Sequence, residues 1–178
     1  MIAVIDVDDV LLDWTQGFDK WVRVEYGYVG IPISQRQDRL FDLFHNEIYN
    51  EFNQSNQFES LNLIKDADIG LIEISKQFDI KLITSCGEQY YKYRKFNLDL
   101  YLSNINYELI VLPLHKSKYE YIDKYKPTIF IDDNIENVKY HADSLTGNTF
   151  LFHTEFNSSF NYKNINRVYT WMEIIKKL

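Results

Sequence analysis

The sequence has 178 residues, 46% of them apolar, and its 19 lysines and arginines against 26 aspartates and glutamates give a formal net charge of −7. This length fits one domain with a sizeable core, and the acidic balance disfavours tight binding to long nucleic acids. The single cysteine, Cys86, excludes an intrachain disulfide and fits a reducing compartment. No apolar run approaches the ~18 residues of a membrane span, and acids interrupt the first run early, so we expect a soluble, cytoplasmic protein without a signal peptide.

The chain opens with an apolar stretch, residues 2–5, that runs directly into three carboxylates, Asp6, Asp8 and Asp9. An apolar run of this kind, rich in β-branched residues, is typical of a buried parallel strand. Carboxylates this close repel one another, and burying even one of them is costly. A positive partner is therefore expected at the end of this strand, and a divalent cation is the simplest one.

A helix is expected over residues 13–26, because Trp14, Phe18, Trp21 and Val22 recur at helical spacing. Two glycines and a proline directly after this stretch indicate where the helix ends. The aromatic residues on its apolar stripe are the first candidates for a packed helical layer outside the predicted sheet.

Another helix, a loop and a third helix are predicted next. Ser34 is expected to cap the second helix. Its apolar residues are Leu40, Phe41, Phe44 and Ile48. The polar residues 50–57 are predicted to form a loop, and Asp66 is expected to cap a helix that ends at residue 78.

From residue 80 onward, predicted strands and helices alternate. The strands are residues 80–84, 108–112, 128–131 and 148–152. The helices are residues 88–102, 118–125 and 135–142. The polar residues 157–166 are expected to form a loop, and a capping box at Thr170 and Glu173 opens a terminal helix. This alternation implies a parallel sheet that helices cover on both faces.

Residues suited to phosphate chemistry follow these predicted elements in a fixed order. Thr84 and Ser85 end one strand, Lys118 opens a helix, and Asp132 and Asp133 end a later strand. Together with the acids of the first strand, the order along the chain is Asp-x-Asp, Thr-Ser, Lys and Asp-Asp. In a parallel sheet the carboxyl ends of the strands share one edge, where ligands bind at the point at which the strand order reverses.

These four motifs, in this order, resemble those of the haloacid dehalogenase superfamily, and the resemblance spans residues 2–138. It implies an α/β fold with a Rossmann-like parallel sheet in the order 3-2-1-4-5 and helices on both faces. It also implies that residues 14–65 form a small helical cap inserted after the first motif. Residues 1–13 and 66–178 would then form the core domain.

The resemblance also implies the roles of the acidic residues. Asp6 would be the nucleophile that forms an aspartyl-phosphate, and Asp8 would act as general acid and then as general base. Mg²⁺ would be held by Asp6, the backbone carbonyl of Asp8, and one or both of Asp132 and Asp133. Without a cation, two unit charges ~4 Å apart repel by about 4 kcal/mol at an effective dielectric constant of 20.

Three residues are candidates for binding the phosphate: Thr84, Ser85 and Lys118. Ser85 also starts a Ser-x-x-Glu pattern, which predicts a capping box and a helix N-terminus facing the phosphate. The lysine of the third motif could be Lys116 or Lys118. Another Ser-x-x-Glu capping box places Lys118 in the first turn of its helix, so we favour Lys118.

Several residues near the motifs have simpler interpretations. Asp9 is interpreted as a turn residue and Cys86 as a small packing residue. For Arg94, a solvated helix face and a contact with substrate remain open alternatives. The histidines show no metal-ligand spacing and are interpreted as surface or structural residues: His45, His115, His141 and His153.

The aromatic residues of the predicted cap allow two interpretations. Trp14, Phe18 and Trp21 form a helical stripe that favours a packed core, yet aromatic rings in a cap could also stack a nucleobase. Further aromatic residues in the same region are Tyr26, Tyr28 and Phe41. The Asp6 motif, the small cap, and the Thr-Ser and Asp-Asp motifs also resemble, more loosely, the 5′(3′)-deoxyribonucleotidase-like branch.

The sequence therefore predicts a Mg²⁺-dependent phosphomonoesterase for a small phosphorylated metabolite, with a nucleoside monophosphate as the leading candidate. One alternative is a 3′-phosphatase acting on nucleic-acid ends, which the acidic net charge disfavours. Another is a non-catalytic binding protein that has kept the fold. No membrane partner and no extended nucleic-acid surface are expected, and the sequence does not fix the oligomeric state.

Overall fold

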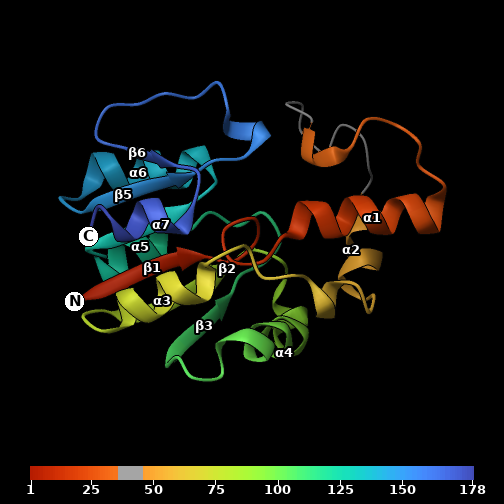
Figure 1. The fold of residues 1–178 in the computed structure, drawn as a ribbon, viewed down its shortest axis with the longest axis horizontal. Coiled ribbons are helices and arrows are strands. Elements are labelled where there is room, and N and C mark those ends of the chain that lie inside the picture. The colour runs from red at the N-terminus through yellow and green to blue at the C-terminus, as the bar shows by residue number, and fades with distance from the viewer. Residues whose placement is uncertain (36–45) are drawn as a thin grey trace.

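The computed structural model describes residues 1–35 and 46–178, and a parallel sheet with helices on both sides organises them (Figure 1). The strand order is β3-β2-β1-β4-β5-β6, and every neighbouring pair runs parallel. The strands are β1 (Ile2–Asp6), β2 (Asp79–Thr84), β3 (Tyr107–Val111), β4 (Ile129–Asp132), β5 (Asn148–Phe152) and β6 (Asn166–Val168). The predicted α/β class and the order 3-2-1-4-5 are confirmed.

The sixth strand corrects the prediction that residues 157–166 form a loop after the last strand. Residue 166 begins β6 instead, and Phe152 of β5 pairs with Val168. Three residues are too few to show an alternating pattern, so no strand could be predicted here from periodicity. Val168 is fully buried, and tertiary packing of this kind decides the conformation of such a short segment.

Two apolar clusters hold helices against the two faces of the sheet. Ala3 and Ile5 of β1 belong to one cluster, whereas Val4 belongs to the other, as expected from the alternation of side chains along a strand. The first cluster includes residues of α3 (Ala67–Ser75), α4 (Tyr91–Leu102) and α7 (Trp171–Ile175). The second includes residues of α5 (Tyr119–Tyr125) and α6 (Ile135–Ser144).

A helical segment lies between β1 and α3, beyond the carboxyl end of β1 (Figure 1). Its described residues form α1 (Trp14–Tyr26), α2 (Asn46–Asn53) and the short 3₁₀ helices η1 (Ile33–Gln35) and η3 (Phe58–Ser60). The predicted first helix is confirmed: the Asp13 carboxylate accepts a hydrogen bond from Gln16 N at 3.3 Å. The helix ends at Gly27, whose φ of 62° is the left-handed conformation that glycine adopts easily.

This segment shares one continuous apolar cluster with the sheet. Phe18, Phe52 and Phe58 from the segment are fully buried in the same cluster as Ile5 of β1. The predicted cap is thus packed against the sheet domain, and its division from residues 1–13 and 66–178 stays a prediction.

Three details of the predicted helices need correction. Residues 50–53 belong to α2 and not to a loop, because Phe52 is buried and its helix packs against the cluster. Ser34 lies in η1, and the predicted helix residues after it lie outside the described part of the chain: Leu40, Phe41 and Phe44. Asp66 precedes α3, but its φ is 63°, its side chain makes no capping hydrogen bond, and the helix ends at Ser75.

Within residues 1–35 and 46–178, none of the helices has the length and apolar character that crossing a membrane requires.

His141 in α6 provides a test of the core that is independent of the site. The ring is fully buried, stacks on Phe130 at 5.0 Å, and its nitrogens contact Thr149 Oγ1 at 2.7 Å and the Pro127 carbonyl at 3.0 Å. Burial lowers the pKa of His141 from 6.5, and the Pro127 carbonyl opposes this change only partly. Below pH 6.5 the unfolded chain therefore binds a proton that the native state does not.

The contribution of His141 to the free energy of unfolding is therefore expected to fall as the pH drops below 6.5, by up to about 1.4 kcal/mol per pH unit. His141→Gln should flatten that part of the dependence. Urea denaturation of both proteins between pH 5 and pH 8, in roughly half-unit steps, measures the difference. Parallel pH curves for the two proteins would show that His141 does not titrate in this way.

Candidate active site

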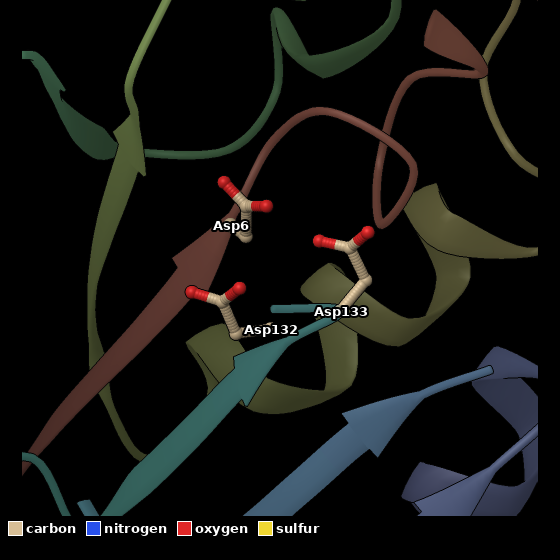
Figure 2. A group of neighbouring side chains, drawn as sticks. All are labelled: Asp6, Asp132 and Asp133. Carbon is tan, nitrogen blue, oxygen red and sulfur yellow. The ribbon is translucent and has the colours of Figure 1, made fainter. Parts of the chain in front are cut away.

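Three aspartates converge at the carboxyl ends of the central strands β1 and β4 (Figure 2). Asp6 ends β1 and Asp132 ends β4, and these strands are direct neighbours, with Ile5 opposite Ile131. Asp133 follows at once. One carboxylate oxygen from each of the three aspartates lies within 4.8 Å of the others. The fold thus joins the first and fourth motifs in one acidic cluster.

Lys118 lies between two of these carboxylates. Its Nζ is 2.5 Å from Asp6 Oδ1 and 2.8 Å from Asp132 Oδ2, and the side chain is 3% exposed. Burial by itself lowers the pKa of Lys118, but the charges of Asp132 and Asp6 raise it above its ordinary value, which keeps the ammonium protonated. Lys116, the alternative, is exposed.

The expected capping box around Lys118 is absent, although the choice of lysine agrees with the geometry. Lys118 is itself the N-cap residue of α5, and no side chain caps this helix. The Lys118 backbone N–H donates instead to Asn137 Oδ1 at 3.2 Å. The Asn137 side chain thus links α6 to the start of α5, and the predicted Ser117 cap is not formed.

Asn137 is a site residue that the sequence prediction missed. Its Nδ2 donates to Asp132 Oδ2 at 3.2 Å, and Asn134 N donates to Asp132 Oδ1 at 2.8 Å. With Lys118, these donors occupy both oxygens of Asp132. Asn137 follows the N-cap residue Asn134 by about one helical turn and is 6% exposed. An asparagine on the buried side of a predicted helix was the sequence feature that could have indicated its role in the site.

The acidic cluster carries more negative charge than Lys118 neutralises. Burial raises the pKa of Asp6 to about 7; the Lys118 ammonium opposes this rise, and the charges of Asp132 and Asp8 add to it. Burial, together with the charges of Asp6 and Asp132, also raises the pKa of Asp133 well above its ordinary value. No hydrogen bond or ion pair to the Asp133 carboxylate is formed within the described residues. Hard oxygen ligands with an unmet negative charge are what Mg²⁺ prefers.

Asp8 is held by two donors at the carboxyl end of β2. Thr84 Oγ1 donates to Asp8 Oδ2 at 2.6 Å, and Arg94 Nη2 lies 2.6 Å from Asp8 Oδ1. Arg94 is fully buried, so the interpretation as a solvated helix face is wrong. The segment containing η3 covers the N-terminal part of α4, and Phe58 lies over the guanidinium. The Thr84 hydroxyl proton is directed at Asp8, and only its oxygen is available to another donor.

Ser85 does not form the predicted capping box. Its hydroxyl donates to the Lys116 carbonyl at 2.7 Å, across the edge of the sheet. The 3₁₀ helix η4 (Glu88–Tyr90) starts after Gly87, whose φ of 105° lies in the left-handed region, and no side chain caps it. Ser85 therefore lies at the edge of the sheet where it was predicted, and its binding of phosphate stays a prediction.

Asp9 has the turn geometry expected for it. Its φ is 59°, and its carboxylate accepts hydrogen bonds from Thr15 N at 2.8 Å and from the Thr15 hydroxyl. Burial raises the pKa of Asp9 to about 7, and both Thr15 hydrogen bonds counteract that rise. Asp9 thereby joins the turn after β1 to the start of α1.

The aromatic residues of α1 are mainly packing residues. Phe18 is fully buried between Trp14 at 4.9 Å and Tyr49 at 5.0 Å, so it offers no free face to a nucleobase. Of the two interpretations left open for Phe18, the structure therefore supports core packing and not contact with substrate. Trp14 and Trp21 are half-buried against the same cluster and keep partly accessible rings. Phe41 lies outside the described residues.

Cys86 and the histidines agree with their structural interpretations. Cys86 is buried, and this burial raises the pKa of its thiol. Among residues 1–35 and 46–178, the group of side chains suited to a metal consists of Asp6, Asp132 and Asp133, without a histidine. His45 lies outside the described residues.

Comparisons with known proteins identify the fold. No protein-family model matches the sequence, and a search of curated proteins finds no match. The structure, in contrast, matches 43 chains of solved structures. One is a haloacid dehalogenase-like hydrolase from Streptococcus pneumoniae, with a TM-score of 0.66 and 12% identity over 99% of this chain and 98% of that one.

Two further neighbours represent different reactions. An L-2-haloacid dehalogenase has a TM-score of 0.60 and 7% identity, with 99% of each chain covered. A protein provisionally assigned as a phosphoglycolate phosphatase, from Lactobacillus plantarum, has a TM-score of 0.62 and 12% identity over 99% of this chain and 98% of that one. At these identities the likeness establishes the fold, and the reaction must come from the site. The chain has the fold of the haloacid dehalogenase-like hydrolases.

Proposed function

We propose that this protein is a Mg²⁺-dependent phosphomonoesterase of the haloacid dehalogenase superfamily that works through an aspartyl-phosphate. The observation that carries the proposal is the cluster of Asp6, Asp132 and Asp133 within 4.8 Å, with Lys118 as its buried cation. The four motifs, in the expected order, and the fold both support superfamily membership. A nucleophilic carboxylate, a basic side chain and a set of hard oxygen ligands together suit phosphoryl transfer.

The acidic cluster also favours phosphate over a haloacid as substrate. A carboxylate attacks a carbon–halogen centre without the repulsion that an anionic phosphate presents. Asp132 and Asp133 beside Asp6 would only add negative charge to a site that acts on an organic halide. Their placement is useful when a cation must be held next to the nucleophile, as phosphate chemistry requires.

The residues present fit Mg²⁺. Asp6 and Asp133 would hold the ion through their carboxylates and Asp8 through its backbone carbonyl. Asp132, whose two oxygens accept from Lys118, Asn137 and a backbone N–H, would instead orient the lysine. When bound, the ion neutralises phosphate charge beside Asp6.

The chain's own residues divide the reaction into two balanced steps. In the first, an Asp6 oxygen bonds to phosphorus, the bond to the leaving oxygen breaks, and Asp8 gives that oxygen its proton. In the second, Asp8 takes a proton from water, the water oxygen bonds to phosphorus, and the bond to Asp6 breaks. Inorganic phosphate leaves, and both carboxyl groups return to their starting states.

Lys118 and the end of β2 would support these steps. The protonated Lys118 stabilises Asp6 as a carboxylate and places positive charge beside the transferring phosphoryl group. Thr84 and Ser85 lie at the neighbouring strand end, where their oxygens and nearby backbone N–H groups face the same edge of the sheet. Thr84 additionally holds Asp8 at 2.6 Å.

A small cytoplasmic phosphomonoester, and first a nucleoside monophosphate, is the proposed substrate. Trp14 and Trp21, which are half-buried, and Tyr26, which is exposed, are the aromatic side chains of α1 proposed to contact a base. The alternative function is a 3′-phosphatase on nucleic-acid ends, which would use the same chemistry. The net charge of −7 disfavours the binding of nucleic acid that this function requires.

A Mg²⁺-supplemented panel of phosphomonoesters tests the proposed function directly. We expect release of inorganic phosphate from p-nitrophenyl phosphate and stronger selectivity among mononucleotides and sugar phosphates than for 3′-phosphorylated oligonucleotides. Release no faster than with the D6N variant across the panel, with the metal demonstrably bound, would favour a non-catalytic binding protein.

Metal binding itself should be measurable without activity. We expect Mg²⁺ to raise the melting temperature of the metal-free protein, because binding to the native state adds RT ln(1 + [L]/Kd), about 2.7 kcal/mol at 100 times Kd. For a chain of this size that corresponds to roughly 5–11 °C. Asp133→Asn removes one proposed ligand and should reduce the rise in melting temperature that Mg²⁺ causes. EDTA should not change the melting temperature of the metal-free variant, which checks that no metal was left in it. An equal Mg²⁺ response in wild type and Asp133→Asn would place the ion elsewhere.

A further inference from the structure

Arg94 is a buried charge directed at Asp8. Its guanidinium is 0% exposed, whereas the Asp8 side chain is 24% exposed, and Nη2 lies 2.6 Å from Asp8 Oδ1. Thr84 Oγ1 holds the other carboxylate oxygen at 2.6 Å. Two donors on two different oxygens fix both the position and the plane of this carboxyl group.

Arg94 leaves part of its hydrogen-bonding capacity unused. Its Nε and Nη1 are buried and form no hydrogen bond within the described part of the chain. The ring of Phe58, from η3, covers the guanidinium at 4.1 Å. Burying a guanidinium with two unpaired nitrogens is unfavourable, and a single ion pair compensates for it only partly. A residue placed mainly for stability would be apolar here.

Arg94 and Thr84 hold Asp8 from regular structure, whereas Asp8 itself lies in the turn after β1. Thr84 ends β2 and Arg94 lies in the first turn of α4, so both donors come from elements packed in the core. The residue after Asp8, Asp9, has a φ of 59°, so the chain turns sharply at this point. Without its donors the Asp8 carboxyl group would sample several rotamers in this turn.

We propose that Arg94 is a positioning residue, which fixes the Asp8 carboxyl group for proton transfer to the leaving oxygen. This inference rests on the proposed phosphomonoesterase function. An alkoxide leaving group requires that proton, whereas p-nitrophenolate does not. Loss of Arg94 should therefore lower kcat for alkyl phosphomonoesters more than kcat for p-nitrophenyl phosphate. A purely structural role would affect both kinds of substrate equally.

The test compares kcat for p-nitrophenyl phosphate with kcat for the best alkyl phosphomonoester of the panel. Arg94→Met is expected to lower kcat for the alkyl substrate about 10- to 100-fold more than for p-nitrophenyl phosphate. The matched control is Lys92→Met, which removes a positive charge from the exposed face of the same helix and should leave both values unchanged. If Arg94→Met fails to fold, Arg94→Lys carries the same comparison, because it keeps the charge but lacks the planar fork.

A double-mutant cycle with Asp8→Asn separates positioning from other roles. Asp8→Asn alone should show the same preference for the good leaving group, and adding Arg94→Met should change kcat less than about twofold. Equal losses on both substrates, or a full additional loss in the Asp8→Asn background, would overturn the inference. A wild-type protein that hydrolyses neither substrate would instead refute the proposed function, since the comparison starts from measurable wild-type turnover.

Discussion

Asp6→Asn is expected to reduce phosphomonoester hydrolysis by about 10⁴-fold or more, because the amide cannot form the phosphoryl bond that the carboxylate forms. The substitution keeps the size of the side chain. It also removes one of three clustered acids, while Lys118 retains its contact with Asp132 at 2.8 Å. The circular dichroism spectrum should therefore match wild type, and kcat should fall with every substrate of the panel.

Asp79→Asn is the matched control for this variant. Asp79 begins β2, at the opposite end of the sheet from the acidic cluster, and is exposed. Its substitution removes the same charge without touching the site, so kcat should stay within about twofold of wild type. Wild-type turnover in Asp6→Asn would refute the assignment of the nucleophile, whatever the substrate proves to be.

Lys118→Met should produce the largest loss of stability among the site variants. It leaves the carboxylates of Asp6 and Asp132 buried without their shared cation, and breaking a buried pair in this way costs roughly 3–5 kcal/mol. In the metal-free protein this corresponds to a decrease in melting temperature of roughly 6–20 °C. Turnover should fall as well, because the charge beside the phosphoryl group is lost.

The adjacent surface lysine and a second substitution serve as controls. Lys116→Met removes an exposed ammonium two residues away and should change the melting temperature little. Adding Asp132→Asn to Lys118→Met removes one uncompensated charge and should restore part of the stability. No recovery in the double variant would mean that the loss comes from packing around the Lys118 side chain and not from the unpaired carboxylates.

The first and fourth motifs could be predicted because their signal is local. An apolar run that ends in Asp6, or in Asp132 and Asp133, specifies both a buried strand and the residue at its end. Parallel pairing then brings those ends together, whatever the intervening residues are. The first helix and the burial of the aromatic stripe depend on the same short-range patterns, whereas the strand order was expected only from the resemblance of the four motifs to a known family.

The donors around these acids could not be predicted, because they depend on contacts between distant elements. Arg94 is buried only because η3 covers α4, and its sequence neighbours look like those of a surface helix. Asn137 of α6 accepts a hydrogen bond from the Lys118 backbone N–H, a contact between two helices. A Ser-x-x-Glu pattern is compatible with several conformations: the Ser85 hydroxyl donates to the Lys116 carbonyl, and α5 begins after Lys118 without a side-chain cap.

We propose that Asp6 receives the phosphoryl group beside a cation held by the acidic cluster. A crystal structure grown with Mg²⁺ and beryllium fluoride, which imitates a carboxyl-bound phosphoryl group, tests it most directly. We expect a beryllium fluoride group on an Asp6 oxygen and a Mg²⁺ ion bound by Asp6, Asp133 and the Asp8 carbonyl. Beryllium fluoride on another residue, or a Mg²⁺ ion that neither Asp6 nor Asp133 binds, would contradict it.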